Sequence, residues 1–304
     1  MKRQHVIGMF DSGVGGLTVM KEITEQLPEL RIVYFGDTAR VPYGNRSREE
    51  LIRFGEEIIT FLISQGAEAI VVACNTSSAN AVPVLKDNFD IPLIGTIEPG
   101  ARSAVKVTEN GKIGLIATEA TVRSKAYSSA ISRVLSKGIL PEKRELRDSW
   151  QQGEQPISLV KAQACPLFVP LVEAGLANSP EARGIARTYL SSIQEAGVDA
   201  LILGCTHYPF LAPILREILG EKIQLVDPAK SMIEELKRVL DKLEEKGTLE
   251  GSEFKTEQVG ETESEKVTWK DRFFVSGDPE LFKQVGDTLL PGKIQDVIQV
   301  SWGD

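Results

Sequence analysis

Two cysteines occupy matching positions in a stretch of sequence that occurs twice. Residues 66–74 (GAEAIVVAC) match residues 197–205 (GVDALILGC) position for position, at a constant offset of 131. Each copy is an apolar run that ends on a cysteine, Cys74 or Cys205, and polar residues follow directly. A thiol can donate a proton and a thiolate can accept one, so two such cysteines can act as an acid and a base.

A single cysteine at the end of an apolar run is more often a small core residue than a reactive group. The repetition favours the reactive interpretation for Cys74 and Cys205. If a helix begins after each cysteine, its N-terminus would lower the thiol pKa and offer N–H groups to an anion. Cys165 lies between Ala164 and Pro166 without such a context, and we expect it to serve core packing.

A glycine-rich segment after the first apolar run supplies a carboxylate. Residues 11–16 (DSGVGG) lack the third glycine of a dinucleotide-binding loop, and Asp37, the acid nearest to the required place, is followed by a polar loop. We therefore expect no nucleotide cofactor. Asp11 is more useful as a proton acceptor or an orienting group beside a thiol.

Composition excludes several other classes of protein. The 304 residues carry a net charge of −8, without a cluster of basic and aromatic residues, so we expect no nucleic-acid partner. Three cysteines and two histidines are too few for a disulfide framework or a metal site. No apolar run reaches the ~18 residues of a membrane helix or resembles a signal peptide, so we expect a cytoplasmic protein.

Short apolar runs alternate with helical patterns, which predicts an α/β fold with mainly parallel sheets. The expected strands are residues 6–10, 32–35, 69–73, 113–117 and 200–204. Ser47 and Glu50 form a capping box, and apolar residues recur at helical spacing from there to Gly66. Residues 7–12 also resemble residues 113–118, at an offset of 106.

The two repeats predict two pseudo-symmetric, doubly wound α/β halves that face a central cleft. Each half would present one cysteine at the carboxyl end of a strand, where open α/β sheets bind ligands. Residues 138–156 and the charged stretch 244–270 lack apolar periodicity, and we interpret both as surface insertions. Beyond them, residues 273–275 resemble a strand and residues 278–290 a capped helix.

Six motifs in order along the chain resemble those of the glutamate racemases, in the aspartate/glutamate racemase superfamily. They are residues 10–16 (FDSGVGG), 42–44 (PYG), 74–76 (CNT), 121–124 (TVRS), 165–173 (CPLFVPLVE) and 204–209 (GCTHYP). The resemblance runs from about residue 6 to residue 230. The polar stretch before Cys165 and the charged stretch before Phe273 are longer than expected for the family.

The resemblance implies racemisation of L-glutamate to D-glutamate for peptidoglycan, without cofactor or metal. It assigns Cys74 and Cys205 as the two acid/base groups on opposite faces of the substrate, with Asp11, His207 and Glu173 tuning which sulfur is ionised. It assigns the binding of the substrate carboxylates to a polar set: Asp11, Ser12, Tyr43, Gly44, Asn75, Thr76, Thr118, Thr121, Thr206 and His207.

The resemblance also implies that one domain is inserted in the other. Residues 1–98 and 209–304 would form the first domain and residues 99–208 the second, and we expect a homodimer. Two alternatives stay open. One is an aspartate racemase or another two-cysteine isomerase, and the other is a non-catalytic amino-acid binding protein, which the retention of both cysteines with Asp11 and His207 disfavours.

Overall fold

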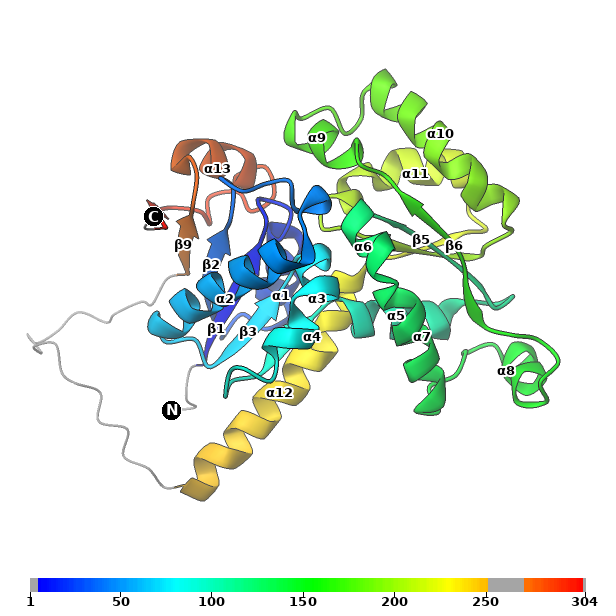
Figure 1. Ribbon diagram of the computed structural model, residues 1–304, viewed down its shortest axis with the longest axis horizontal. Helices are drawn as coiled ribbons and strands as arrows, with labels where there is room; N and C mark the ends of the chain where they lie inside the picture. The colour runs from blue at the N-terminus through cyan, green and yellow to red at the C-terminus, as the bar shows by residue number, and fades with distance from the viewer. Residues whose placement is uncertain (1–4, 251–270, 303–304) are drawn as a thin grey trace, which may run out of the picture.

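The computed structural model describes residues 5–250 and 271–302, which form two lobes, each built on a parallel β-sheet (Figure 1). The six-stranded sheet of the first lobe has the order β10-β9-β2-β1-β3-β4, and the four-stranded sheet of the second lobe has the order β6-β5-β7-β8. The strands are β1 (Val6–Asp11), β2 (Arg31–Gly36), β3 (Ala69–Val72), β4 (Leu93–Gly95), β5 (Lys112–Ala117), β6 (Ser158–Ala164), β7 (Ala200–Gly204), β8 (Gln224–Val226), β9 (Arg272–Val275) and β10 (Val297–Gln299).

Helices cover both faces of each sheet, as the sequence predicted for a doubly wound fold. The α-helices are α1 (Leu17–Gln26), α2 (Arg48–Ser64), α3 (Asn75–Asn80), α4 (Val82–Leu85), α5 (Ile97–Val107), α6 (Glu119–Ser124), α7 (Ala126–Ser136), α8 (Arg144–Gln151), α9 (Phe168–Glu173), α10 (Pro180–Glu195), α11 (Ala212–Leu219), α12 (Pro228–Glu250) and α13 (Pro279–Gly286). Two short 3-10 helices are η1 (Tyr43–Asn45) and η2 (Tyr208–Leu211).

The two sheets repeat one arrangement residue by residue. β2-β1-β3-β4 in the first lobe corresponds to β6-β5-β7-β8 in the second, and every strand pair is parallel. Gly8 of β1 lies opposite Ile70 of β3, and Gly114 of β5 lies opposite Leu201 of β7. A Cβ on Gly8 would come within 2.5 Å of the Ile70 side chain, and one on Gly114 within 3.0 Å of the Leu201 side chain. Both halves therefore need glycine at the same place in the sheet.

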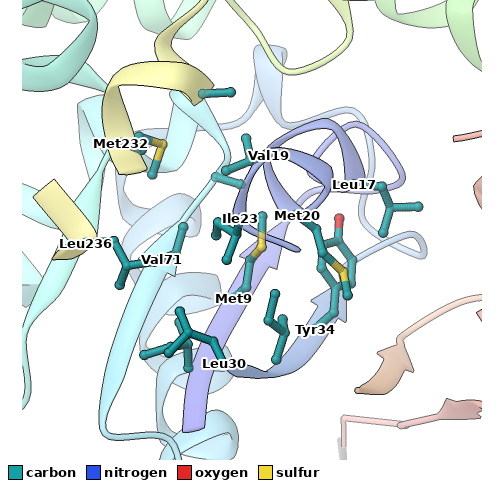
Figure 2. Packing of buried hydrophobic residues seen from close by; sticks show 14 of the residues in the cluster. Met9, Leu17, Val19, Met20, Ile23, Leu30, Tyr34, Val71, Met232 and Leu236 are labelled. Carbon is teal, nitrogen blue, oxygen red and sulfur yellow. The ribbon is translucent and has the colours of Figure 1, made fainter. Parts of the chain in front are cut away.

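Alternating side chains of the first sheet divide its core into two layers. On one face, Met9, Tyr34 and Val71 pack against α1 and α12, and Figure 2 shows Met20 of α1 and Met232 of α12 in this layer. On the other face, side chains such as Phe10 pack against α2. The helix α2 begins with the predicted capping box of Ser47 and Glu50. The predicted strand at residues 273–275 and the helix capped by Asp278 are also present, although α13 ends at Gly286 rather than at residue 290.

Helix α12 connects the two lobes. It runs along the first lobe from a position between the lobes (Figure 1), and it contacts α5, whose residues Ile97 and Ala101 belong to the core of the second lobe. Ser103 of α5 and Ser231 of α12 share a hydrogen bond, and Arg102 pairs with Glu235 at 3.4 Å. These polar contacts join α12 to the second lobe.

The predicted return to the first domain at residue 209 comes too early. β8 pairs with β7 in the second sheet, and α11 packs against α10. The strand β8 in this continuation is three residues long, which is too short for its sequence to show a pattern. We propose that the second domain extends to about Val226.

One predicted surface insertion contributes to the core. Within residues 138–156, α8 buries Leu146 against the second lobe and packs Trp150 at its edge. Two apolar residues four positions apart give too little periodicity to distinguish a short helix from a loop. In the second predicted insertion, residues 244–250 continue α12, while residues 251–270 lie outside the described residues. In the described part of the chain, no helix is long and apolar enough to cross a membrane.

Candidate active site

The two matched cysteines lie at the carboxyl ends of the matched strands β3 and β7. Cys74 is 4% exposed and Cys205 is 7% exposed. Cys74 is the N-cap of α3, as the sequence predicted. The prediction is wrong for Cys205, because the chain turns after it and the 3-10 helix η2 begins only at Tyr208.

Both cysteines line one cavity of about 160 Å³. A single water needs only about 10–15 Å³ measured in this way, so the cavity has room for a molecule of the size of an amino acid. Most of the predicted site residues line it, from both lobes: Ser12, Tyr43, Gly44, Cys74, Asn75, Thr76, Thr118, Cys205, Thr206 and His207. The remaining predicted residues, Asp11, Thr121 and Glu173, each contact a lining residue instead.

Cys205 stands at the start of a line of three interacting side chains. Its Sγ lies 3.8 Å from Nδ1 of His207, and Nε2 of His207 lies 2.6 Å from Oε1 of Glu173. Burial opposes a charge on the imidazole, but hydrogen bonds to Cys205 and Glu173 prevail and raise the pKa of His207 well above its usual value. A protonated His207 stabilises a thiolate on Cys205.

Asp11 is fully buried and interacts with both half-sites, which are the groups around Cys74 and the groups around Cys205. Its carboxylate accepts hydrogen bonds from the Gly13 N–H at 3.1 Å and from the Thr206 hydroxyl at 3.2 Å. Burial raises the pKa of Asp11 above its usual value, while the charge of His207 opposes this shift. Asp11 therefore acts electrostatically on both half-sites, whereas the sequence predicted only that it lies beside one thiol.

The glycine-rich loop after β1 allows side chains of the second lobe to pack closely against it. A Cβ on Gly15 would lie 2.4 Å from the Thr206 hydroxyl and 2.6 Å from Nδ1 of His207. Only a glycine leaves room for these two side chains. The loop thus has a packing role.

The thiol of Cys74 is held in its neutral form. Burial raises its pKa to about 12, and the negative charge of Asp11 adds to this effect. The sequence predicted a lowered pKa from the start of a helix, and this is wrong because the cost of burying a charge outweighs the contribution of the six-residue helix α3. Tyr43 packs in the same small cluster as Cys74, and burial also raises its pKa well above its usual value, so it remains neutral.

Neutral hydrogen-bonding groups cover the wall of the cavity near Cys74. The hydroxyls of Thr76 and Thr118 lie 2.9 Å apart and join the two lobes, and Thr121 lies 2.9 Å from Thr118. The carbonyl oxygen of Asn75 accepts from Thr96 at 3.0 Å and from Tyr127 at 2.6 Å. The Asn75 amide group is therefore oriented so that its NH₂ can donate to a ligand.

Several lining residues were not predicted from the sequence. They are Val41, Pro42, Asn45, Glu119, Cys165, Pro166 and Val169. Cys165 is fully buried and packs in the core as expected, yet it also borders the cavity. The signal that could have located it is its position directly after β6, since strand ends of one parallel sheet share an edge. Across residues 5–250 and 271–302, no group of side chains is arranged to hold a metal ion.

Comparisons with known proteins agree with this architecture. A family model described as Asp/Glu/Hydantoin racemase matches residues 7–236. The chain is 45% identical over 297 residues to the glutamate racemase of Geobacter metallireducens, covering 97% of this chain and 96% of that protein. Among solved structures, glutamate racemase from Thermus thermophilus in complex with β-chloro-D-alanine has a TM-score of 0.74 at 38% identity, covering 98% and 97% of the two chains.

A second solved structure is glutamate racemase from Francisella tularensis in complex with D-glutamate. It has a TM-score of 0.77 at 31% identity and covers 98% of each chain. Racemases are isomerases, and the extent of these matches shows that the chain belongs to the Asp/Glu/hydantoin racemase family of enzymes.

Proposed function

We propose that this enzyme interconverts L- and D-glutamate without a cofactor, using Cys74 and Cys205 on opposite faces of the α-carbon. One sulfur, as thiolate, removes the α-proton, and the other, as thiol, delivers a proton to the opposite face. The observation that carries the proposal is the position of the two thiols. They follow matched strands of two repeated sheets and line the same cavity.

Mirror-image substrates require an acid and a base in nearly mirror-image positions. A repeated lobe supplies them, because each copy brings one sulfur to the cavity from its own side. Glutamate is favoured as substrate by relatives that are themselves glutamate racemases, with 45% and 38% identity. An aspartate racemase is the alternative that a side-by-side assay must exclude.

The polar wall of the cavity suits an anionic amino acid. Hydroxyl and amide groups of Ser12, Asn75, Thr76, Thr118 and Thr206 line it. Such groups can donate to the two carboxylates of glutamate. We assign them to binding, and we assign Asp11, His207 and Glu173 to control of the protonation of the sulfurs.

The proposal includes a biological role for the product. D-Glutamate formed in the cytoplasm would supply the synthesis of peptidoglycan. We also propose that the enzyme forms a homodimer, which sedimentation of the purified protein would check.

Early turnover in D₂O tests the two-base mechanism. With two thiols, product formed in the first turnovers should carry deuterium at the α-carbon, while unreacted substrate stays mostly protonated. A single base that serves both faces would return part of the original hydrogen to the product. Substantial α-protium in early product would therefore disprove the pairing of Cys74 with Cys205.

Substrate identity needs a separate assay. Circular dichroism of L-glutamate and L-aspartate solutions, each mixed with the enzyme, should show loss of signal with glutamate. Faster loss with aspartate would reassign the substrate, and a stable signal with both would indicate a binding protein.

A further inference from the structure

Ser77 places a buried hydroxyl beside the Cys74 half-site. Its side chain is 0% exposed, and within the described residues its Oγ makes no hydrogen bond of ordinary geometry. A buried hydroxyl without a partner opposes folding. Its neighbour Ser78 is also buried, but the Ser78 hydroxyl donates to the carbonyl oxygen of Val72 at 2.9 Å. The unpaired hydroxyl is therefore specific to Ser77.

The position of Ser77 in α3 directs it toward Cys74. Cys74 is the N-cap of this helix, and Ser77 is its third residue. In that relation, the backbone N–H of the third residue faces the capping side chain, and side chains three positions apart are neighbours on the helix surface. Burial is the largest influence and raises the pKa of Cys74 to about 12, whereas both groups of Ser77 lower it.

The ionisable groups around Cys74 do not offer the sulfur a comparable donor. Asp11 at the end of β1 and Cys205 beyond β7 both raise the pKa of Cys74 through their negative charge. The phenol of Tyr34 on β2 donates to the carbonyl oxygen of Gly13, and the phenol of Tyr43 in η1 donates to Asp37, so neither hydroxyl is free to donate to the sulfur. Among the groups that act most strongly on Cys74, those of Ser77 are the ones that lower its pKa.

In the second half-site, a different residue lies beside the sulfur as a hydrogen-bond donor. The position that matches Ser77 is Tyr208, whose hydroxyl donates to the carbonyl oxygen of Cys165 at 3.0 Å. Cys205 instead has His207 at 3.8 Å. The repeated lobes thus place different donors beside their two sulfurs.

We propose that Ser77 is a positioning residue of the reaction. Its hydroxyl stands unpaired beside the neutral Cys74 thiol and donates to the sulfur when Cys74 becomes the thiolate base. This inference rests on the proposed two-thiol function. Ser77 does not line the cavity, so it acts through Cys74 rather than on the substrate.

Alkylation of a single thiol tests the proposal without turnover. In a full-length Cys165→Ala/Cys205→Ser background, the rate of alkylation by iodoacetamide reports the thiolate fraction of Cys74. Adding Ser77→Ala should slow this rate about tenfold at a fixed pH well below the pKa of Cys74, because a hydrogen bond to a charged sulfur shifts its pKa by about one unit. Ser77→Thr, which keeps a hydroxyl, should restore most of the rate.

Two controls separate ionisation from packing. In a Cys74→Ser/Cys165→Ala background, Ser77→Ala should leave alkylation of Cys205 unchanged, although the reagent enters the same cavity. Ser77→Ala should also keep or raise the melting temperature, since it removes an unpaired buried hydroxyl. Ser78→Ala should lower the melting temperature, because it removes a satisfied hydrogen bond.

Turnover of the Ser77→Ala enzyme gives a second readout. The Michaelis constant should rise for the enantiomer that binds the Cys74-thiolate form, because a smaller fraction of enzyme is in that form. The Michaelis constant of the other enantiomer should change less. Equal changes for both enantiomers would point to a general loss of packing and contradict the proposal.

Unchanged alkylation of Cys74 in the folded Ser77→Ala protein would overturn the inference, as would equal slowing at Cys205. Either result would leave the two-thiol mechanism standing. The mechanism itself would fail if enzyme lacking Cys74 still racemised glutamate, and that result would not alter the alkylation rates.

Discussion

The two half-sites share a backbone and differ in the groups that surround the sulfur. On the side of Cys74, burial and the Asp11 carboxylate favour the neutral thiol, whose pKa is raised to about 12. On the side of Cys205, His207 lies 3.8 Å from the sulfur and is itself held by Glu173 at 2.6 Å. The ligand-free protein therefore favours the neutral thiol at Cys74, and it places a protonated imidazole beside Cys205.

This difference shows how a duplicated fold can perform a symmetric reaction with unequal groups. Enantiomers have the same free energy, so kcat/KM must be equal in the two directions whatever the environment of each thiol. The difference between the two thiol environments can therefore change kcat and KM for each enantiomer, but it cannot change the ratio of kcat/KM between the two directions. The predictions below test whether the two half-sites are equally necessary and separately tuned.

Loss of either thiol should have the largest effect. Cys74→Ala and Cys205→Ala should each lower the rate of glutamate racemisation by at least ~10³, because general acid/base groups contribute about 10² to 10⁴ and each face has one. Circular dichroism with L- and D-glutamate measures both directions. Cys165→Ala serves as the control and should stay active, while near-normal activity in either of the other variants would exclude the mechanism.

Glu173→Gln should weaken only the Cys205 side. Without this carboxylate the raised pKa of His207 should fall, and kcat/KM should drop by about tenfold to a hundredfold near neutral pH. The folded protein stabilises His207 in its protonated form. The stabilising effect of this charge is complete below the ordinary histidine pKa of about 6.5, and it is lost as pH rises through the pKa of His207 in the folded protein. The loss of activity in the variant should therefore grow toward alkaline pH.

A pH–rate profile measures this shift. Glu181→Gln, at the exposed start of α10, is a matched control and should leave the profile unchanged. If the pH–rate profiles of the Glu173→Gln and unmodified enzymes are parallel, Glu173 does not control the ionisation of His207.

The backbone comparison can be sharpened at the matched glycines. Gly8→Ala and Gly114→Ala should both destabilise the fold by about 1–3 kcal/mol through overpacking. The Gly8 variant should lose more, because its Cβ would come within 2.5 Å of Ile70, against 3.0 Å to Leu201 for Gly114. Chemical denaturation gives the two free energies, and a larger loss at Gly114 would show that the lobes are packed less similarly than their register implies.

Asp11→Asn should give the smallest change in stability, with the opposite sign. Burial raises the Asp11 pKa, so the folded state favours the protonated acid, and this stability is lost as pH rises through the folded pKa. The amide cannot ionise, so the variant should gain about 1 kcal/mol of stability at neutral pH while its activity falls. Melting temperatures at acidic and neutral pH check this, since a gain that does not grow with pH would contradict the assignment.

Much of the architecture could be predicted from sequence because the central strands are long and apolar. All six predicted strands are present, and the two offsets of 106 and 131 correspond to the matched register of Gly8 with Ile70 and of Gly114 with Leu201. The missed strands β4, β8 and β10 have three residues each, too few for a period to appear. β6 is longer but has no buried residue, so its composition gave no strand signal.

The environment of each thiol could be predicted only in part. The motifs identified the residues that meet at the cavity, but the pKa of Cys74 depends on burial, which arises only when α3, η1 and the Asp11 loop pack together. The 3.8 Å approach of His207 to Cys205 follows from local sequence, since the residues are two apart. Its partner Glu173 is 34 residues away, and the pair forms only in the folded lobe.

The position of α12 bears on how the protein is made on the ribosome. The core layer of the first lobe needs Met232 and Leu236 of α12 together with Phe273 and Phe282, all of which follow the last strand of the second lobe. The second lobe can therefore fold while the first still lacks a face. Until the residues beyond Val226 have emerged, β2 is an unpaired edge and the α12 side of its sheet is uncovered, which makes this lobe the one that depends on protection from aggregation during synthesis.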